Sequence, residues 1–209
     1  MRIYLVTDEG LLLGKDLYRT VEAAVKGGVS MVQLREKESS TREFIERAIR
    51  LKEVLTPYGV PLIINDRVDV ALAADADGVH VGQSDMPYEM VKRLLPEGKI
   101  IGLSVESPEQ VLEANDYDLD YVAASPVFST TTKTNTIVEW GLDGLRWIRS
   151  VSRHPLVAIG GIHSNNVASI CKAGADSVAV ISAIVSADDP ERAARELLSR
   201  RPSGLRKTR

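Results

Sequence analysis

The chain has 209 residues, of which 44% are hydrophobic and 26% are charged, a balance typical of one globular domain. Its 26 lysine and arginine residues are outweighed by 29 aspartate and glutamate residues, and the net charge of −3 gives no support for nucleic-acid binding. No stretch approaches the ~20 apolar residues of a membrane helix and no secretory signal precedes the first apolar run, so we expect a cytoplasmic protein with no membrane partner.

Short apolar runs alternate with helical patterns along the whole chain. The apolar runs predict strands at 3–7, 31–35, 61–65, 78–81, 99–104, 120–124, 156–159 and 176–180. The patterns between them predict helices at about 16–26, 41–55, 68–74, 86–95, from 107, at 142–151, at 165–173 and from 190. Eight strands in strict alternation with helices predict an α/β fold, a compact (β/α)8 TIM barrel of eight parallel strands.

The predicted barrel occupies residues 1–200 as a single domain, and residues 201–209 form a basic tail that we expect to be poorly ordered. A barrel this short needs short loops, so the one long connection, residues 125–140, calls for a functional explanation. The single cysteine, Cys171, lies in an apolar helical pattern and is expected to be a buried small side chain. His80 is expected to be a hydrogen-bonded interior residue, and the three histidines form no ligand pattern.

Active sites of this fold lie at the carboxyl ends of the strands, which directs attention to the residues after each apolar run. Gln33, Arg35 and Lys37 alternate at the end of the second strand and would share one face there. Two cations at the barrel mouth suit a polyanionic substrate. The alternative is a solvated strand end with salt bridges to Glu36 and Glu38.

Asp66 and Asp85 end adjacent strands, which lie about 4.8 Å apart in a sheet. Their carboxylates can converge on Mg²⁺, which usually takes one or two carboxylates and completes its shell with water and phosphate oxygens. The alternative for each is a helix cap.

Gly160 and Gly161 end the seventh strand and, in our interpretation, open a helix. Backbone amides at such a helix start would form an anion site; the alternative is a simple tight turn.

Seven ordered segments resemble the thiamine-phosphate synthase family from end to end. They are 33–37 (QLREK), 64–71 (INDRVDVA), 76–87 (ADGVHVGQSDMP), 101–104 (IGLS), 130–133 (TTTK), 158–162 (AIGGI) and 180–184 (VISAI). The chain differs from the usual family pattern at Ser125 and Ser129, where the family has Gly and Pro, which affects the shape of the long loop. The resemblance implies an enzyme, a transferase that joins hydroxymethylpyrimidine diphosphate to hydroxyethylthiazole phosphate and releases pyrophosphate.

The resemblance also implies roles for individual residues. The pyrimidine diphosphate would be held by Gln33, Arg35, Lys37, Asn65, Ser104 and Lys133, of which Arg35, Lys37, Ser104 and Lys133 would be catalytic. The thiazole phosphate would be held by Thr130, Thr131, Thr132, Gly161, Ile181 and Ser182. Asp66 and Asp85 would bind one Mg²⁺, and Tyr4 would contact the pyrimidine ring.

Two alternatives share the fold. A thiazole tautomerase would bind the thiazole phosphate without needing the metal carboxylates or the full cationic set, both of which are present here. A non-catalytic sensor of phosphorylated ligands would have no turnover. The expected partners are two phosphorylated small molecules, and the sequence leaves the oligomeric state open, a homo-oligomer included.

Overall fold

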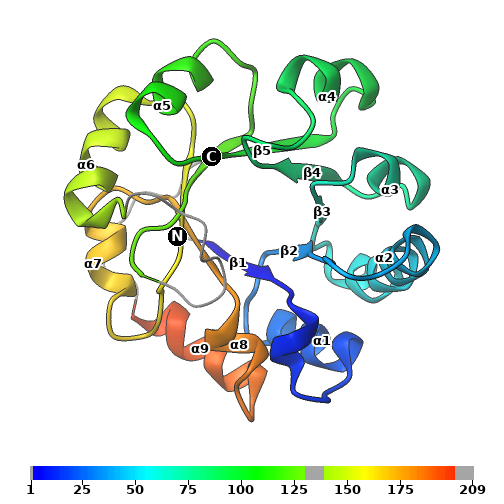
Figure 1. The fold of residues 1–209 in the computed structure, drawn as a ribbon. Helices are drawn as coiled ribbons and strands as arrows, with labels where there is room; N and C mark the ends of the chain where they lie inside the picture. Colours follow the sequence, from blue (N-terminus) through cyan, green and yellow to red (C-terminus); the bar gives the residue numbers. More distant parts are fainter. Residues whose placement is uncertain (1, 130–138, 201–209) are drawn as a thin grey trace.

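The computed structural model describes residues 2–129 and 139–200 and contains a closed barrel of parallel strands (Figure 1). The strands are β1 (Arg2–Val6), β2 (Met31–Leu34), β3 (Leu62–Asn65), β4 (Gly78–Val81), β5 (Ile100–Val105), β6 (Tyr121–Ala124), β7 (Leu156–Ile159) and β8 (Ser177–Val180). Each strand pairs with the next in the chain, and β8 pairs with β1 to close the ring. The predicted (β/α)8 barrel is confirmed.

Helices surround the strands in Figure 1. They are α1 (Leu17–Lys26), α2 (Thr41–Leu55), α3 (Val68–Ala73), α4 (Tyr88–Leu94), α5 (Pro108–Ala114), α6 (Gly141–Val151), α7 (Val167–Lys172), α8 (Ser182–Val185) and α9 (Pro190–Ser199), with 3-10 turns η1 (Glu9–Leu12) and η2 (Thr56–Tyr58). The bounds of α2 match the prediction because its start is a capping box between Ser40 and Glu43. Within the described ranges, no helix has the length and apolar character needed to cross a bilayer.

Several elements differ from the sequence prediction. The strand expected at 31–35 ends at Leu34, so Arg35 belongs to the loop that follows. The turns η1 and η2 and the short helix α8 were not predicted, because elements of three or four residues are too short to show a periodic pattern. The predicted tail, residues 201–209, lies outside the described residues.

The strands are buried on both faces, which accounts for their continuous apolar sequences. On β1, Ile3 and Leu5 belong to the large core between barrel and helices, whereas Tyr4 and Val6 point into the barrel. The buried hydrophobic side chains inside the barrel are Tyr4, Val6, Ile63, Tyr121, Ala123, Val157 and Ala179. Cys171 is buried in the outer core, as predicted.

Three aspartates brace the barrel at the end opposite the strand tips. Each directly precedes an even-numbered strand, and its carboxylate accepts a hydrogen bond from the first or second backbone N–H of the strand before. The pairs are Asp77 with Leu62, Asp120 with Ile101 and Asp176 with Leu156, at 2.8, 2.8 and 2.9 Å. These bonds satisfy strand-end donors that the sheet leaves free, so this end of the barrel is fixed and the opposite end carries the variable chemistry.

Candidate active site

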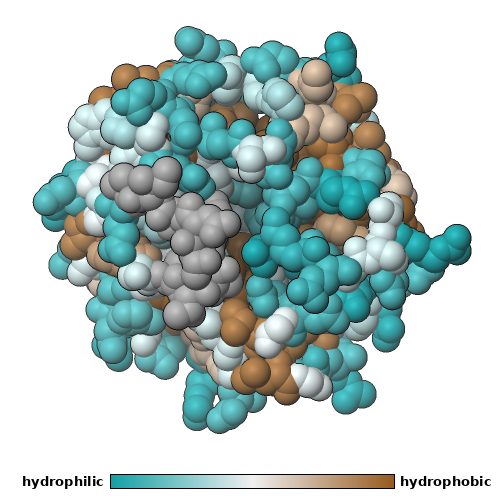
Figure 2. Space-filling model, in the orientation of Figure 1, coloured by the Kyte–Doolittle hydropathy of each residue, from teal (hydrophilic) through white to brown (hydrophobic). Residues whose placement is uncertain are grey.

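A cavity of about 1330 Å³ opens among the carboxyl ends of the strands. It is larger than the ~300–1,000 Å³ of common ligand pockets, which leaves room for two ligands. The described residues of the predicted site all line it: Gln33, Arg35, Lys37, Asn65, Asp66, Asp85, Ser104, Gly161, Ile181 and Ser182, with Tyr4. Figure 2 shows hydrophilic residues gathered on this face over the loops after β2 to β4. Thr130, Thr131, Thr132 and Lys133 lie outside the described residues.

The two cations after β2 are held by carboxylates from other loops. The Arg35 guanidinium donates to Asp8 at 2.8 Å, and the Lys37 ammonium donates to Asp66 at 2.7 Å. The alternative, in which Arg35 and Lys37 form salt bridges with Glu36 and Glu38, is therefore wrong. Arg35 and Lys37 follow the end of β2, so the alternation of side chains along a strand does not set their directions. Contacts with neighbouring loops set them instead. Both nevertheless line the cavity with Gln33.

Asp66 and Asp85 are close enough to influence one another. Burial, followed by the neighbouring Asp66, raises the pKa of Asp85 above its usual range. The Asp85 carboxylate also accepts the backbone N–H of Gly82 at 2.7 Å. Asp66 has a φ of 63°, a left-handed conformation that costs a non-glycine residue energy and commonly marks a functional position.

Neither aspartate serves as a helix cap, so the alternative considered for them is wrong. The cap positions of α3 and α4 are occupied by Arg67 and Pro87, and neither helix receives a side-chain cap bond. Among the described residues, no group of three or more His, Cys, Asp or Glu side chains could enclose a metal. Two converging carboxylates still fit Mg²⁺, since it usually keeps several waters and takes phosphate oxygens as further ligands.

A chain of hydrogen bonds crosses the floor of the cavity. The Gln33 amide donates to the Tyr4 hydroxyl at 2.6 Å, and a 2.8 Å bond joins the hydroxyls of Tyr4 and Tyr121. The His80 ring bonds to the Tyr121 hydroxyl at 3.0 Å and to the Ser104 hydroxyl at 2.9 Å. All five side chains are buried. His80 is thus the interior hydrogen-bonded residue that was expected.

Burial also keeps the two tyrosine hydroxyls of this floor uncharged. It raises the pKa of both the Tyr4 and the Tyr121 hydroxyl well above the usual range, so both stay protonated near neutral pH. The Tyr121 ring packs edge-on against Tyr4 and stacks on His80, with centroids 5.8 and 5.6 Å apart. The floor is therefore a closely packed surface with hydrogen-bonding groups, suited to a flat polar ring.

The opposite side of the cavity is built from backbone. Gly160 and Gly161 have φ values of 103° and 63°, which only glycine adopts readily. They do not open a helix as we had interpreted, because α7 begins at Val167. The Gly161 carbonyl instead accepts the Asn166 side-chain amide at 2.8 Å. Ile181 and Ser182, directly after β8, complete this side.

Sequence reasoning missed one residue of the cavity wall and two residues that support it. Gln83 lines the cavity, and its amide donates to the Ser104 carbonyl at 2.6 Å; it lies within the segment 82–85 after the fourth strand. Asp8, which pairs with Arg35, follows the first strand and could have been found by the rule applied to the other strand ends. Tyr121, which supports Tyr4 and His80, begins its strand and gave no signal, because its role depends on contacts with distant strands.

Comparison with known proteins gives one consistent result. A family model described as thiamine monophosphate synthase matches residues 3–184. Thiamine-phosphate synthase from Albidiferax ferrireducens is 53% identical over 190 residues, covering 91% of this chain and 87% of that protein. The enzyme of the same name from Vibrio parahaemolyticus is 51% identical over 198 residues, covering 95% and 97%.

A solved structure agrees with these relatives. Thiamine phosphate pyrophosphorylase from Pyrococcus furiosus superposes with a TM-score of 0.87 at 41% identity, covering 95% of this chain and 94% of that one. The range matched by the family model, residues 3–184, spans nearly the whole barrel and contains the described positions that line the cavity. The solved relative has the same fold. The chain belongs to the thiamine monophosphate synthase family.

Proposed function

We propose that this protein is a thiamine-phosphate synthase that joins 4-amino-2-methyl-5-hydroxymethylpyrimidine diphosphate to 4-methyl-5-(2-hydroxyethyl)thiazole phosphate. The products are thiamine phosphate and pyrophosphate. One observation carries the proposal: in a chain of this family, Arg35, Lys37, Asp66 and Asp85 converge on the wall of one cavity large enough for two substrates. Cations beside paired carboxylates are the groups that a diphosphate with a bound divalent ion requires.

The pyrimidine diphosphate fits the side of the cavity formed by β2 to β5. Arg35 and Lys37, joined by Lys133, would neutralise the negative charge that grows on pyrophosphate as it leaves. Asn65 lines the same wall. Gln33, Ser104 and Tyr4 offer hydrogen-bonding groups at the floor, where the aminopyrimidine ring would lie.

The thiazole phosphate fits the side formed by β7 and β8. The positive φ of Gly161 brings backbone close to the cavity with no side chain in the way. Ile181 and Ser182 face the same space. Thr130, Thr131 and Thr132 would supply further hydrogen-bond donors to this phosphate.

Asp66 and Asp85 would hold one Mg²⁺. When bound there, the ion would neutralise charge on the diphosphate and orient it. The carboxylates suit this role because they are near each other, while Asp85 is already oriented by the Gly82 amide. A hydrogen bond of this kind to a ligating carboxylate keeps it oriented toward the metal.

The chemistry that remains for the chain is electrostatic. The aminopyrimidine is electron-rich, so loss of pyrophosphate gives a stabilised carbocation, and the thiazole nitrogen attacks it. That nitrogen has no proton to lose, and the reaction needs no general base. Holding the two substrates face to face across the cavity would supply most of the remaining rate enhancement.

Incubation of the purified protein with both substrates and Mg²⁺, followed by assay for thiamine phosphate, tests this function. Formation of thiamine phosphate and pyrophosphate in equal amounts is the expected result. Isomerisation of the thiazole phosphate without joining would identify a tautomerase, and binding with no turnover would identify a sensor. In this role the enzyme would act in the cytoplasm, with two phosphorylated small molecules as its partners.

A further inference from the structure

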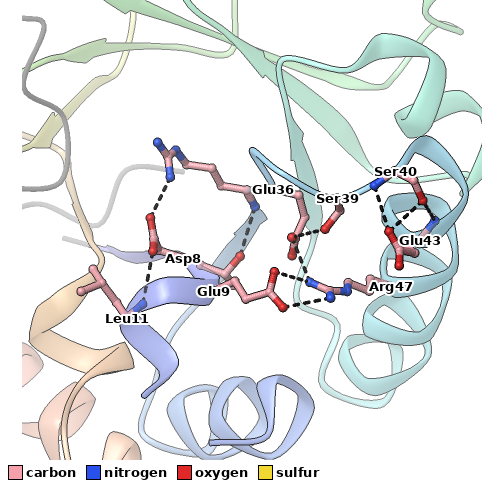
Figure 3. A network of polar contacts seen from close by, with 10 residues as sticks. Asp8, Glu9, Leu11, Glu36, Ser39, Ser40, Glu43 and Arg47 are labelled. Carbon is pink, nitrogen blue, oxygen red and sulfur yellow. Dashed lines mark hydrogen bonds and ion pairs between the residues drawn. The ribbon is translucent and has the colours of Figure 1, made fainter. Parts of the chain in front are cut away.

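The segment after β2 presents two cations to the cavity and buries the acid between them. Arg35 and Lys37 line the cavity, whereas the Glu36 side chain is only 4% exposed. The Glu36 carboxylate accepts hydrogen bonds from Arg47 at 2.9 Å and from the Ser39 hydroxyl at 2.8 Å. Figure 3 shows these contacts beside the start of α2. Glu36 is thus an internal anchor for the two residues that flank it.

Arg47, on α2, holds this anchor and a second loop at once. Its guanidinium donates hydrogen bonds to Glu36 and to one carboxylate oxygen of Glu9, and it forms an ion pair with the other Glu9 oxygen, each at 2.9 Å (Figure 3). The pairing with Arg47 lowers the pKa of Glu9, so this carboxylate stays charged. Glu9 follows Asp8, whose carboxylate holds Arg35. One guanidinium therefore connects both loops that fix the direction of Arg35.

The physical demand on Arg47 is specific. Glu36 is a nearly buried carboxylate, and removing its cationic partner would leave an unpaired charge. A lysine could pair with one carboxylate but lacks the planar fork that contacts Glu36 and Glu9 together. Without that fork, the two loops would be free to shift, and the cations beside Glu36 would shift with them.

We propose that Arg47 is a positioning residue for the pyrophosphate-binding cations: it fixes Glu36 and Glu9 so that Arg35 and Lys37 point into the cavity before substrate arrives. This inference rests on the proposed function, because it assigns those two cations to the diphosphate. Arg47 does not line the cavity. Its effect on the reaction must therefore pass through the two loops.

The first experiment compares Arg47→Met with Arg50→Met. Arg50 lies on the same helix but stacks over the Tyr18 ring, 4.1 Å from its centroid, and serves as the matched control. Arg47→Met should raise KM for the pyrimidine diphosphate and lower kcat, with kcat/KM falling ~10-fold to ~10²-fold, the effect of misplacing charged groups by about an ångström. KM for the thiazole phosphate should change little, and Arg47→Lys should recover part of the loss.

A second variant covers the case in which Arg47→Met does not fold. Glu36→Gln combined with Arg47→Met removes the buried charge along with its partner, which favours a stable fold. The double variant should melt near the wild type yet retain the pyrimidine diphosphate defect. Wild-type kinetics in this variant, or equal effects of Arg47→Met and Arg50→Met on both substrates, would overturn the positioning role.

Titration of inorganic pyrophosphate in the presence of Mg²⁺ separates this inference from the proposed function. If the wild type makes no thiamine phosphate, the proposed function fails, yet pyrophosphate should still bind the wild type and Arg50→Met more tightly than the Arg47 variants. Equal pyrophosphate affinity in all of these proteins would refute the role of Arg47 whether or not the wild type is a synthase.

Discussion

Gly102 on β5 leaves the space that the Tyr121 ring occupies inside the barrel. The two residues are direct partners across β5 and β6. A β-carbon at Gly102 would lie 2.1 Å from the Tyr121 ring carbon Cζ and 2.3 Å from its hydroxyl oxygen. Because carbon atoms pack at ~3.5–4.0 Å, Gly102→Ala forces the ring to move by roughly 1.5 Å. The Tyr121 hydroxyl would then lose its bonds to Tyr4 and His80.

Two effects lower the free energy of unfolding of Gly102→Ala. Overpacking a well-filled core typically costs ~1–3 kcal/mol, and a buried hydroxyl left without partners costs a further ~1–3 kcal/mol. Gly102→Ala should therefore lower the free energy of unfolding by ~2–6 kcal/mol. For a protein of this size, each kcal/mol lowers the melting temperature by ~2–4 °C, so we expect a fall of roughly 4–24 °C.

The assay is thermal unfolding followed by circular dichroism, with Gly98→Ala as control. A β-carbon at Gly98 would meet nothing within 4 Å, although its φ of +85° makes the substitution strained. The control should thus lose only the ~1–2 kcal/mol of a left-handed backbone. Gly102→Ala should also raise KM for the pyrimidine diphosphate at temperatures where it is folded. A melting temperature for Gly102→Ala at or above that of the control would refute the packing argument.

Three further predictions concern the proposed site. Asp66→Ala and Asp85→Ala should each remove most activity while the protein stays folded; wild-type rates in the presence of EDTA would contradict a metal role. Gly161→Val should weaken thiazole phosphate binding more than pyrimidine diphosphate binding, because its β-carbon would lie 2.8 Å from the Phe128 β-carbon and 2.9 Å from the Ser129 carbonyl oxygen and would push that segment. Equal losses for both ligands in direct titrations would argue against separate phosphate sites. Lys133→Ala should lower turnover by ~10²–10³, as for one preorganised electrostatic donor, with little change in thiazole phosphate affinity; joining at the wild-type rate in a single turnover would show that Lys133 has no such role.

Much of the site could be predicted because parallel strands bring their carboxyl ends to one face. That rule alone places Asp66 near Asp85 and brings Gly161 to the same rim, although these residues are far apart in the chain. The rule did not give the partner of any side chain. Lys37 pairs with Asp66 instead of its sequence neighbours, and Arg35 pairs with Asp8. Loops leave several partners within reach of a long side chain, and packing selects among them.

The amino-acid sequence by itself determined the order and kind of the elements, because hydrophobic periodicity and helix caps are local properties. Helix α2 has the predicted bounds for this reason: Ser40 and Glu43 satisfy the first backbone donors wherever the helix lies. Only the tertiary structure decided how side chains meet inside the barrel. Tyr4 and Tyr121 share a hydrogen bond across 117 positions of sequence, and Arg47 connects Glu9 to Glu36 only once α2 has packed beside both loops. Such contacts depend on barrel closure and strand register, which arise from the packing of the whole chain and leave no local pattern.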